Sequence, residues 1–222
     1  MLTSRLLGAG GVGGAKATYL ETRTSGPTST SFSFTNVAVG SSSAPHHCLV
    51  MIEMEGFGEV VADSVTVAGQ PCNRLVWASD QIDQFSFMKV FIYITSSEIT
   101  DTTGTVSVTY IAGQDAVAVS TYALSGLESN AAIDTGSKGT TSSFSDTLST
   151  QDGGVLLVYG AGTGDPIYTH ISPLIEDFDS FITGSDSTIH TGAHIYTEGS
   201  SQSFTLGVSS ASYAAQCAVS LR

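Results

Sequence analysis

The chain has 222 residues, of which 41% are hydrophobic and 12% charged, and its 20 acidic residues against 7 lysines and arginines give a formal net charge of −13. Phosphate binding needs clustered cations, whereas the cations here are scattered singly, so we expect no binding to nucleic acid or to an anionic membrane surface. No apolar run approaches the roughly 20 residues that span a bilayer, and no signal-peptide core follows the N-terminus, so we expect a soluble protein without membrane insertion.

Residues 1–26 are predicted to form an extended Gly-rich arm outside the domain, because the run GAGGVGGA at 8–15 has almost no side-chain area to bury. Residues 8–13 also match the GxGxxG pattern of dinucleotide-binding proteins, which requires a buried strand before the glycines and an amphipathic helix after them. Neither SRLL nor TYLETRT supplies these elements, so we expect no cofactor. The side chains and glycines predicted to make the arm's assembly contacts are Leu6, Leu7, Gly10, Val12, Tyr19 and Leu20.

Residues 27–222 are predicted to form the β-sandwich domain. Apolar residues alternate with polar ones around 32–39, 60–67, 106–110 and 117–124, and an apolar run covers 48–54. This period of two, with β-branched and aromatic residues between Gly/Ser/Thr turns, is typical of antiparallel strands. Both faces of 85–94 are apolar, which indicates a central strand covered on both sides.

Further strands are expected at 144–148, 155–159, 188–196, 204–208 and 214–221. Residues 125–140 are predicted to be a connection, and 160–184 the longest irregular segment, with its 171–181 part the only helix-like stretch. The halves 27–124 and 141–222 echo each other, since SFSF before LVMI resembles SFS before LLVY. We therefore predict an all-β, antiparallel, jelly-roll-like β-sandwich of eight or more strands, with pseudo-duplicated halves if the echo is not chance.

Three cysteines, Cys48, Cys72 and Cys217, are odd in number and widely spaced. A disulfide framework favours an even count and a zinc site favours close pairs, so we expect buried thiols, with one bridged pair as the alternative. His190 and His194 share a strand face, but four residues separate them by about 13 Å, too far for one metal ion. Carboxylates at 176–186 could supply a loop calcium site, although the DxDxDG spacing is absent.

A glycan-contact region is a second possibility, because aromatic faces stack on sugars while acidic and imidazole groups bind hydroxyls. The candidate residues are Asp165, Tyr168, His170, His194 and Tyr196. Trp77 could add to such a platform or pack in the core. An acidic pair in the same loops could also be the carboxylates of a glycosidase, but there is no GxSxG, HExxH or GxxxxGK[ST] motif and we assign no catalytic residue.

The Gly-rich arm, the opening strand at 32–39, the VTVAGQ hairpin at 65–70 and the final strand at 214–221 together resemble virion proteins of tailed bacteriophages. The resemblance is to head decoration proteins and to tail or fibre modules. It implies a non-enzymatic subunit in symmetric copies, located in the virion and assembled in the host cytoplasm. Its partners would be other virion proteins, copies of itself and a host surface glycan.

These features leave three hypotheses open. The first is a virion structural protein anchored by its N-terminal arm, and the second is a lectin-like or receptor-binding module. The third is a carbohydrate-active enzyme that uses acidic loop residues. Arm deletion would separate the first from the second, because only the first depends on docking through residues 1–26.

Overall fold

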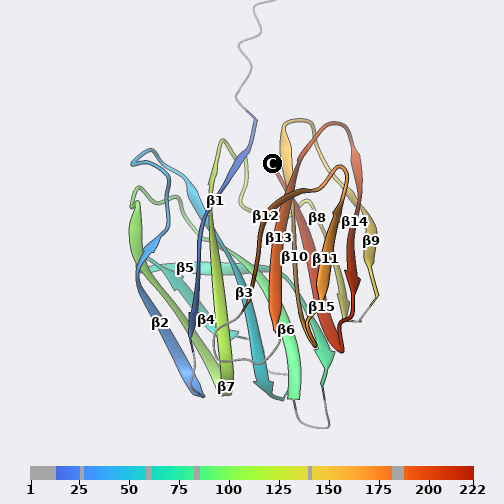
Figure 1. Ribbon diagram of the computed structural model, residues 1–222. Coiled ribbons are helices and arrows are strands. Elements are labelled where there is room, and N and C mark those ends of the chain that lie inside the picture. Colours follow the sequence, from blue (N-terminus) through green and yellow to red (C-terminus); the bar gives the residue numbers. More distant parts are fainter. Residues whose placement is uncertain (1–13, 26–27, 59–61, 83–85, 140–141, 182–187) are drawn as a thin grey trace, which may run out of the picture.

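The computed structural model describes residues 14–25, 28–58, 62–82, 86–139, 142–181 and 188–222, and over them the chain is all-β and antiparallel (Figure 1). The strands are β1 (Lys16–Ser25), β2 (Ser29–Ala38), β3 (His47–Phe57), β4 (Ala62–Val67), β5 (Gln70–Gln81), β6 (Ser86–Thr95), β7 (Thr103–Ser125), β8 (Asp134–Gly139), β9 (Phe144–Ser149), β10 (Gly154–Thr163), β11 (Ile167–Ile171), β12 (Ile175–Phe181), β13 (Ile189–Thr197), β14 (Ser201–Ser209) and β15 (Tyr213–Leu221). Within these ranges we find no helix with the length and apolar character needed to cross a membrane.

The first seven strands form a closed barrel, which lies on the left in Figure 1. The sheet order is β1-β7-β3-β6-β5-β4, and β4 returns to pair with β7. The 23-residue strand β7 closes the ring because its first part pairs with β2 and β4 and its second part with β1 and β3. A closed ring leaves few free backbone groups at its edges.

The remaining strands form two antiparallel sheets, on the right in Figure 1. A five-stranded sheet has the order β12-β13-β10-β15-β8, and a three-stranded sheet has the order β11-β14-β9. Each pairing in these two sheets has a counterpart in the barrel if β8 to β13 are matched with β1 to β6 and β14 and β15 with the two parts of β7. The two halves of the chain therefore follow one order of strand pairing.

Three apolar cores hold the layers together. One fills the barrel, with Val50, Ile52 and Phe91 among its fully buried residues. A second, which we call the seam, lies between the barrel and the five-stranded sheet and includes Met51 and Leu157. The third lies between the five-stranded and three-stranded sheets. Strand β10 is buried along nearly its whole length because it is covered by cores on both faces.

The two predicted strands at the centre of the chain are confirmed in part. Strand β6 is buried on both faces, as its pattern predicted. The sequence pattern separates the strands around 106–110 and 117–124 by a turn that contains Gly113, but both belong to the continuous strand β7, whose pairing with β2 and β3 shifts register near Gln114.

Three segments expected to be irregular are strands. Residues Lys16–Ser25, predicted as part of the arm, form β1 and pair with the second part of β7, so the sheet begins well before residue 27. Strand β8 lies in the predicted connection at 125–140, and β11 and β12 lie in the predicted irregular segment at 160–184. The helix-like stretch at 171–181 is therefore a turn and a strand.

The cysteines are free, and Cys48 and Cys217 are fully buried, as predicted. Cys72 is partly buried, and burial raises the pKa of its thiol to about 12. A thiol with so high a pKa forms little of the reactive thiolate at neutral pH.

Candidate functional site

Strand β1 connects the barrel to the five-stranded sheet through an aromatic cluster at the seam. The Tyr19 ring stacks on Phe178 of β12, with ring centroids 4.9 Å apart, and meets the edge of Tyr122 of β7 at 5.6 Å. Gly192 of β13 makes room for this packing, since a Cβ there would lie 2.3 Å from the Phe178 ring. Such aromatic pairs add roughly 0.5–1.5 kcal/mol each beyond the area that they bury.

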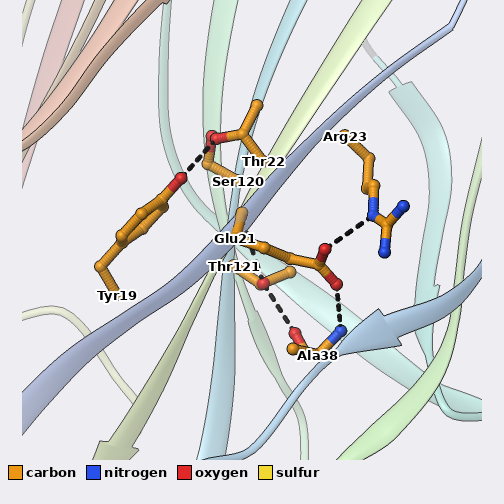
Figure 2. A network of polar contacts seen from close by, with 7 residues as sticks. All are labelled: Tyr19, Glu21, Thr22, Arg23, Ala38, Ser120 and Thr121. Carbon is orange, nitrogen blue, oxygen red and sulfur yellow. Dashed lines mark hydrogen bonds and ion pairs between the residues drawn. The ribbon is translucent and has the colours of Figure 1, made fainter.

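Hydrogen bonds made by side chains also fix β1 to the barrel (Figure 2). The hydroxyls of Tyr19 and Thr22 lie 3.0 Å apart, and that of Ser120 is 2.7 Å from Thr22. The Glu21 carboxylate accepts a hydrogen bond from the Ala38 backbone N–H and pairs with Arg23 at 2.7 Å.

The Ala38 carbonyl completes this network because it accepts a bond of 2.7 Å from the Thr121 hydroxyl (Figure 2). Strand β1 therefore contacts both β2 and β7 through side chains as well as through its ladder.

A largely buried carboxylate lies beside the aromatic cluster of the seam. Asp177 of β12 accepts a hydrogen bond of 2.9 Å from the Tyr122 hydroxyl and lies 2.9 Å from His194 Nδ1. Burial, with the Asp177 charge as a smaller cause, raises the pKa of Tyr122 well above its ordinary value, so the phenol keeps its hydrogen and donates. The group Tyr122, Asp177 and His194 thus ties β7 to β12 and β13.

A pocket of about 500 Å³ opens beside this group, where the chain enters β1. It is lined by Gly14, Ala15, Lys16, Gly153, Gly154, Tyr196, Thr197 and Glu198, and we call it the entry pocket. The Tyr196 ring is 46% exposed there, and its hydroxyl donates a bond of 3.1 Å to the Ala17 carbonyl. The pocket offers one aromatic ring, one carboxylate and one ammonium group.

The five predicted glycan-contact residues do not form a single group. His194 and Tyr196 share one face of β13, as expected, and their rings pack edge to face with centroids 4.9 Å apart. His170 lies on the opposite face of the sheet, with its Nε2 2.8 Å from the Thr191 hydroxyl oxygen. Because the Thr191 hydroxyl donates its hydrogen to the Phe178 carbonyl, it accepts the hydrogen bond from His170. Tyr168 is buried in the core between the two sheets, and Asp165 is exposed in the turn before β11.

The predicted arm contacts divide between described and undescribed residues. Tyr19 belongs to the aromatic cluster, and Leu20 lies at the β-bulge of β1. Leu6, Leu7, Gly10 and Val12 lie outside the described residues. Trp77, the other candidate aromatic, packs against the barrel core, where its ring stacks at 6.0 Å on Phe91.

The acidic residues considered for calcium do not gather into a metal site in the part of the chain that the structure describes, which shows no group of three or more His, Cys, Asp or Glu suited to an ion. Asp177 is bonded to Tyr122 and His194, and Glu176 lies 3.2 Å from His170 Nδ1. Burial, followed by the charge of Glu176, raises the pKa of Asp179. Asp186 lies outside the described residues.

Two buried titratable residues could not be recognised from their sequence neighbours. Glu53 of β3 faces the seam, is only 1% exposed and has both carboxyl oxygens unpartnered, and burial raises its pKa well above the ordinary value. His190 of β13 lies 3.0 Å from the Tyr159 hydroxyl, and burial lowers its pKa to about 3. Glu53 is therefore protonated and His190 neutral in the folded protein near pH 4 to 5.

Comparison with known proteins found no matching family model, no similar curated protein and no similar solved structure.

Proposed function

We propose that this protein is a structural subunit of a tailed-phage virion, a decoration or tail component that assembles in symmetric copies through its N-terminal residues. One observation carries the proposal, which is the shared pairing order of the two halves. Each half has eight strands if the first part of β7 is counted as the seventh strand and its second part as the eighth. In each half the first strand pairs with the eighth, the eighth with the third and the third with the sixth. The second strand pairs with the seventh, and the seventh pairs with the fourth.

That order resembles the eight-strand jelly roll, apart from the additional pairing of the fifth strand with the sixth, so we interpret the chain as two jelly-roll-like units in tandem. Viral capsid proteins, lectins and cupins are built on this arrangement, and the first two correspond to the two candidate functions considered for this chain. The support is an analogy at the level of fold, which raises the expectation of a function without assigning residues to it. A surface with few charges and many Ser, Thr and Gly residues suits a subunit packed against copies of itself.

The experiment is immunogold labelling of virions purified from the source organism with an antibody raised against the full chain. We expect label at regular positions on the head or the tail, and the chain among the virion proteins by mass spectrometry. Virions that carry no label and no peptide of this chain would overturn the proposal. Particles treated with antibody preadsorbed on the purified chain provide the control.

A lectin-like module is the second candidate, and the entry pocket favours it. An exposed aromatic ring with a carboxylate beside it is an arrangement that can stack on a sugar face and bind its hydroxyls. A glycan array with the full chain tests this idea, with Tyr196→Ala expected to abolish binding and Trp77→Phe expected to leave it unchanged. If both variants bind glycans equally well, the entry pocket is not the glycan-binding site.

A further inference from the structure

The two halves differ at one pairing, which leaves a free strand edge in the second half. In the barrel β4 and β5 pair through Thr66 with Pro71 and Val67 with Gln70. Their counterparts β11 and β12 are each the last strand of a sheet, and each pairs with only one neighbour among the described strands. We call the outer sides of β11 and β12 the open edge.

Large apolar side chains are concentrated at the open edge. Among the described residues, five large hydrophobic side chains are exposed, and four of them lie on β11 or β12. They are Ile167, Ile171, Ile175 and Phe181, with exposed fractions of 61%, 48%, 51% and 66%. Proteins normally protect a free edge with charges, bulges or a cover, and β12 has both acidic residues and a bulge between Glu176 and Phe178. These devices disfavour pairing with another acidic strand, whereas the exposed apolar side chains leave a surface for a partner strand of different composition.

The charges on β12 restrict which strand can bind. Glu176 and Asp179 are exposed on this strand, and Asp177 lies between them. Two copies of β12 pairing edge to edge would bring these carboxylates together, which destabilises a sheet. The partner strand must therefore be apolar and neutral or cationic.

Residues 2–7 of this chain, Leu-Thr-Ser-Arg-Leu-Leu, have that composition, with three leucines, Arg5 and no acidic residue. Fully extended, they span about 20 Å at roughly 3.3 Å per residue, which matches the seven-residue strand β12. The sequence between positions 8 and 14, which links this segment to the domain, contains five glycines. The described chain starts at Gly14 in the entry pocket, close to the end of β13, where His194 pairs with Ile175 of β12.

We propose that residues 2–7 of one copy add as a strand to the open edge of β12 in a neighbouring copy. Backbone hydrogen bonds extend the five-stranded sheet, the leucines cover Ile175 and Phe181, and Arg5 lies near Glu176 or Asp179. The choice of a neighbouring copy rests on the proposed function, because an arm bound to its own chain would fill the edge without linking subunits. Exchange of such a segment between identical chains is a common route to symmetric oligomers.

Photo-cross-linking of the full chain tests this contact. The photoreactive residue p-benzoylphenylalanine replaces Leu6, and equal amounts of ¹⁴N- and ¹⁵N-labelled protein are mixed, irradiated and analysed by mass spectrometry. We expect cross-links between light and heavy chains that fall on residues 167–181. The same photoreactive residue at Ser42, in an exposed turn of the barrel, is the control and should not reach this region.

Edge variants sharpen the test. Ile175→Ser combined with Phe181→Ser should reduce the cross-linking at least tenfold, and Arg5→Glu should also reduce it. Glu98→Gln, at an exposed position between β6 and β7 away from the open edge, should leave it unchanged. Because these side chains are exposed, the melting temperatures of the variants should stay close to that of the parent protein.

Cross-links that join only light to light and heavy to heavy chains would overturn the exchange, as would cross-links outside 167–181 or none at all. The outcome is independent of virion labelling. Heavy-to-light cross-links on β12 together with unlabelled virions would support the exchange and reject the virion role. Labelled virions without heavy-to-light cross-links on β12 would support the virion role and reject the exchange.

Discussion

The two halves of this chain use the same order of strand pairing but end it differently. In the first half β4 and β5 are joined by a two-residue turn, Ala68 and Gly69, in which both residues have positive φ angles, and the strands pair at once on either side of it. Turns of this kind match the twist of paired strands. In the second half the residues between β11 and β12 include Pro173, which has no N–H to donate, and the two strands diverge into different sheets.

The comparison shows how a small local difference decides the exposure of a large surface. Closure through β4 and β5 completes the ring, and Val65 and Val67 of β4 are buried in the barrel core. Without that closure, the isoleucines of β11 and β12 lie in solvent. The turn between β4 and β5 thus accompanies a closed core in the first half, whereas the connection between β11 and β12 leaves an apolar surface available for assembly in the second half.

The largest expected effect on stability comes from replacing a large buried side chain in the core of each half with alanine. Ile52→Ala in the barrel and Leu156→Ala between the two sheets should each lower the free energy of unfolding by about 2–5 kcal/mol. Since the seam joins the halves over many buried residues, both variants should shift one shared transition in chemical denaturation. Two separate transitions, each moved by only one variant, would show that the halves unfold independently. Ile167→Ala, at an exposed position, is the control.

The bond between Tyr122 and Asp177 at the seam should have the next largest effect. Tyr122→Phe removes a hydrogen bond to a carboxylate without changing the ring, which should cost roughly 1.5–3 kcal/mol in thermal or denaturant unfolding. Tyr213→Phe, at a partly exposed ring in β15, should be close to neutral and serves as the matched control. Equal effects for the two changes would contradict the role given to Asp177.

Glu53 should make the stability of the seam depend on pH. Its pKa is raised by burial, so the folded state binds its proton more tightly than the unfolded state, and stability falls as the pH rises from the unfolded pKa through the folded one. Glu53→Gln should remove this pH dependence. Glu53→Met, which also removes the unpartnered oxygens, should stabilise the protein at pH 8 by about 1–3 kcal/mol.

Thermal melts of the Glu53 variants between pH 4 and 9 measure this effect, with Glu98→Gln at an exposed position as the control. A parent protein whose melting temperature does not fall toward high pH relative to Glu53→Gln would refute the assignment. His190, whose pKa is lowered to about 3, acts in the other direction, because its contribution is lost as the pH falls below the unfolded pKa.

The smallest expected effect is at the turn that distinguishes the halves. Gly69→Ala places a side chain at a φ of 80° and should destabilise the barrel by about 1 kcal/mol. Open space surrounds this position, so strain in the backbone is the expected cause rather than a clash. Gly199→Ala, at a φ of 91° with open space in the second half, should cost a similar amount, and a much larger cost at Gly69 would mean that barrel closure depends on this turn.

Sequence patterns predicted strands where one face or both faces are apolar, as in β3, β6 and β10. They did not predict β8, because Asp-Thr-Gly-Ser-Lys-Gly contains no apolar residue and becomes a strand only by pairing with β15. Strand β1 was assigned to the arm because the glycines before it dominate the pattern, yet its partners lie about 100 residues later in β7. Such distant pairing overrides local propensity.

For the candidate site, the period of two placed His194 and Tyr196 on one face of β13, and the structure agrees. It could not show that Asp177 would lie next to His194, because that contact depends on the pairing of β12 with β13 across a bulge. The contact of Asp177 with Tyr122 could not be predicted either, because Tyr122 belongs to the other half of the chain.

The shared strand β7 also sets the order in which the barrel can be made during synthesis. Strand β7 pairs with β1, β2, β3 and β4. Tyr19 therefore cannot contact Tyr122 until β7 has emerged from the ribosome. Until then only the β3–β6–β5–β4 ladders can form, with both outer strands of that sheet unprotected. Contacts so distant along the chain slow folding and lengthen the exposure of nascent edges. A ribosome-bound chain arrested before residue 103 should therefore bind chaperones strongly, and one arrested well beyond residue 125 should bind them less.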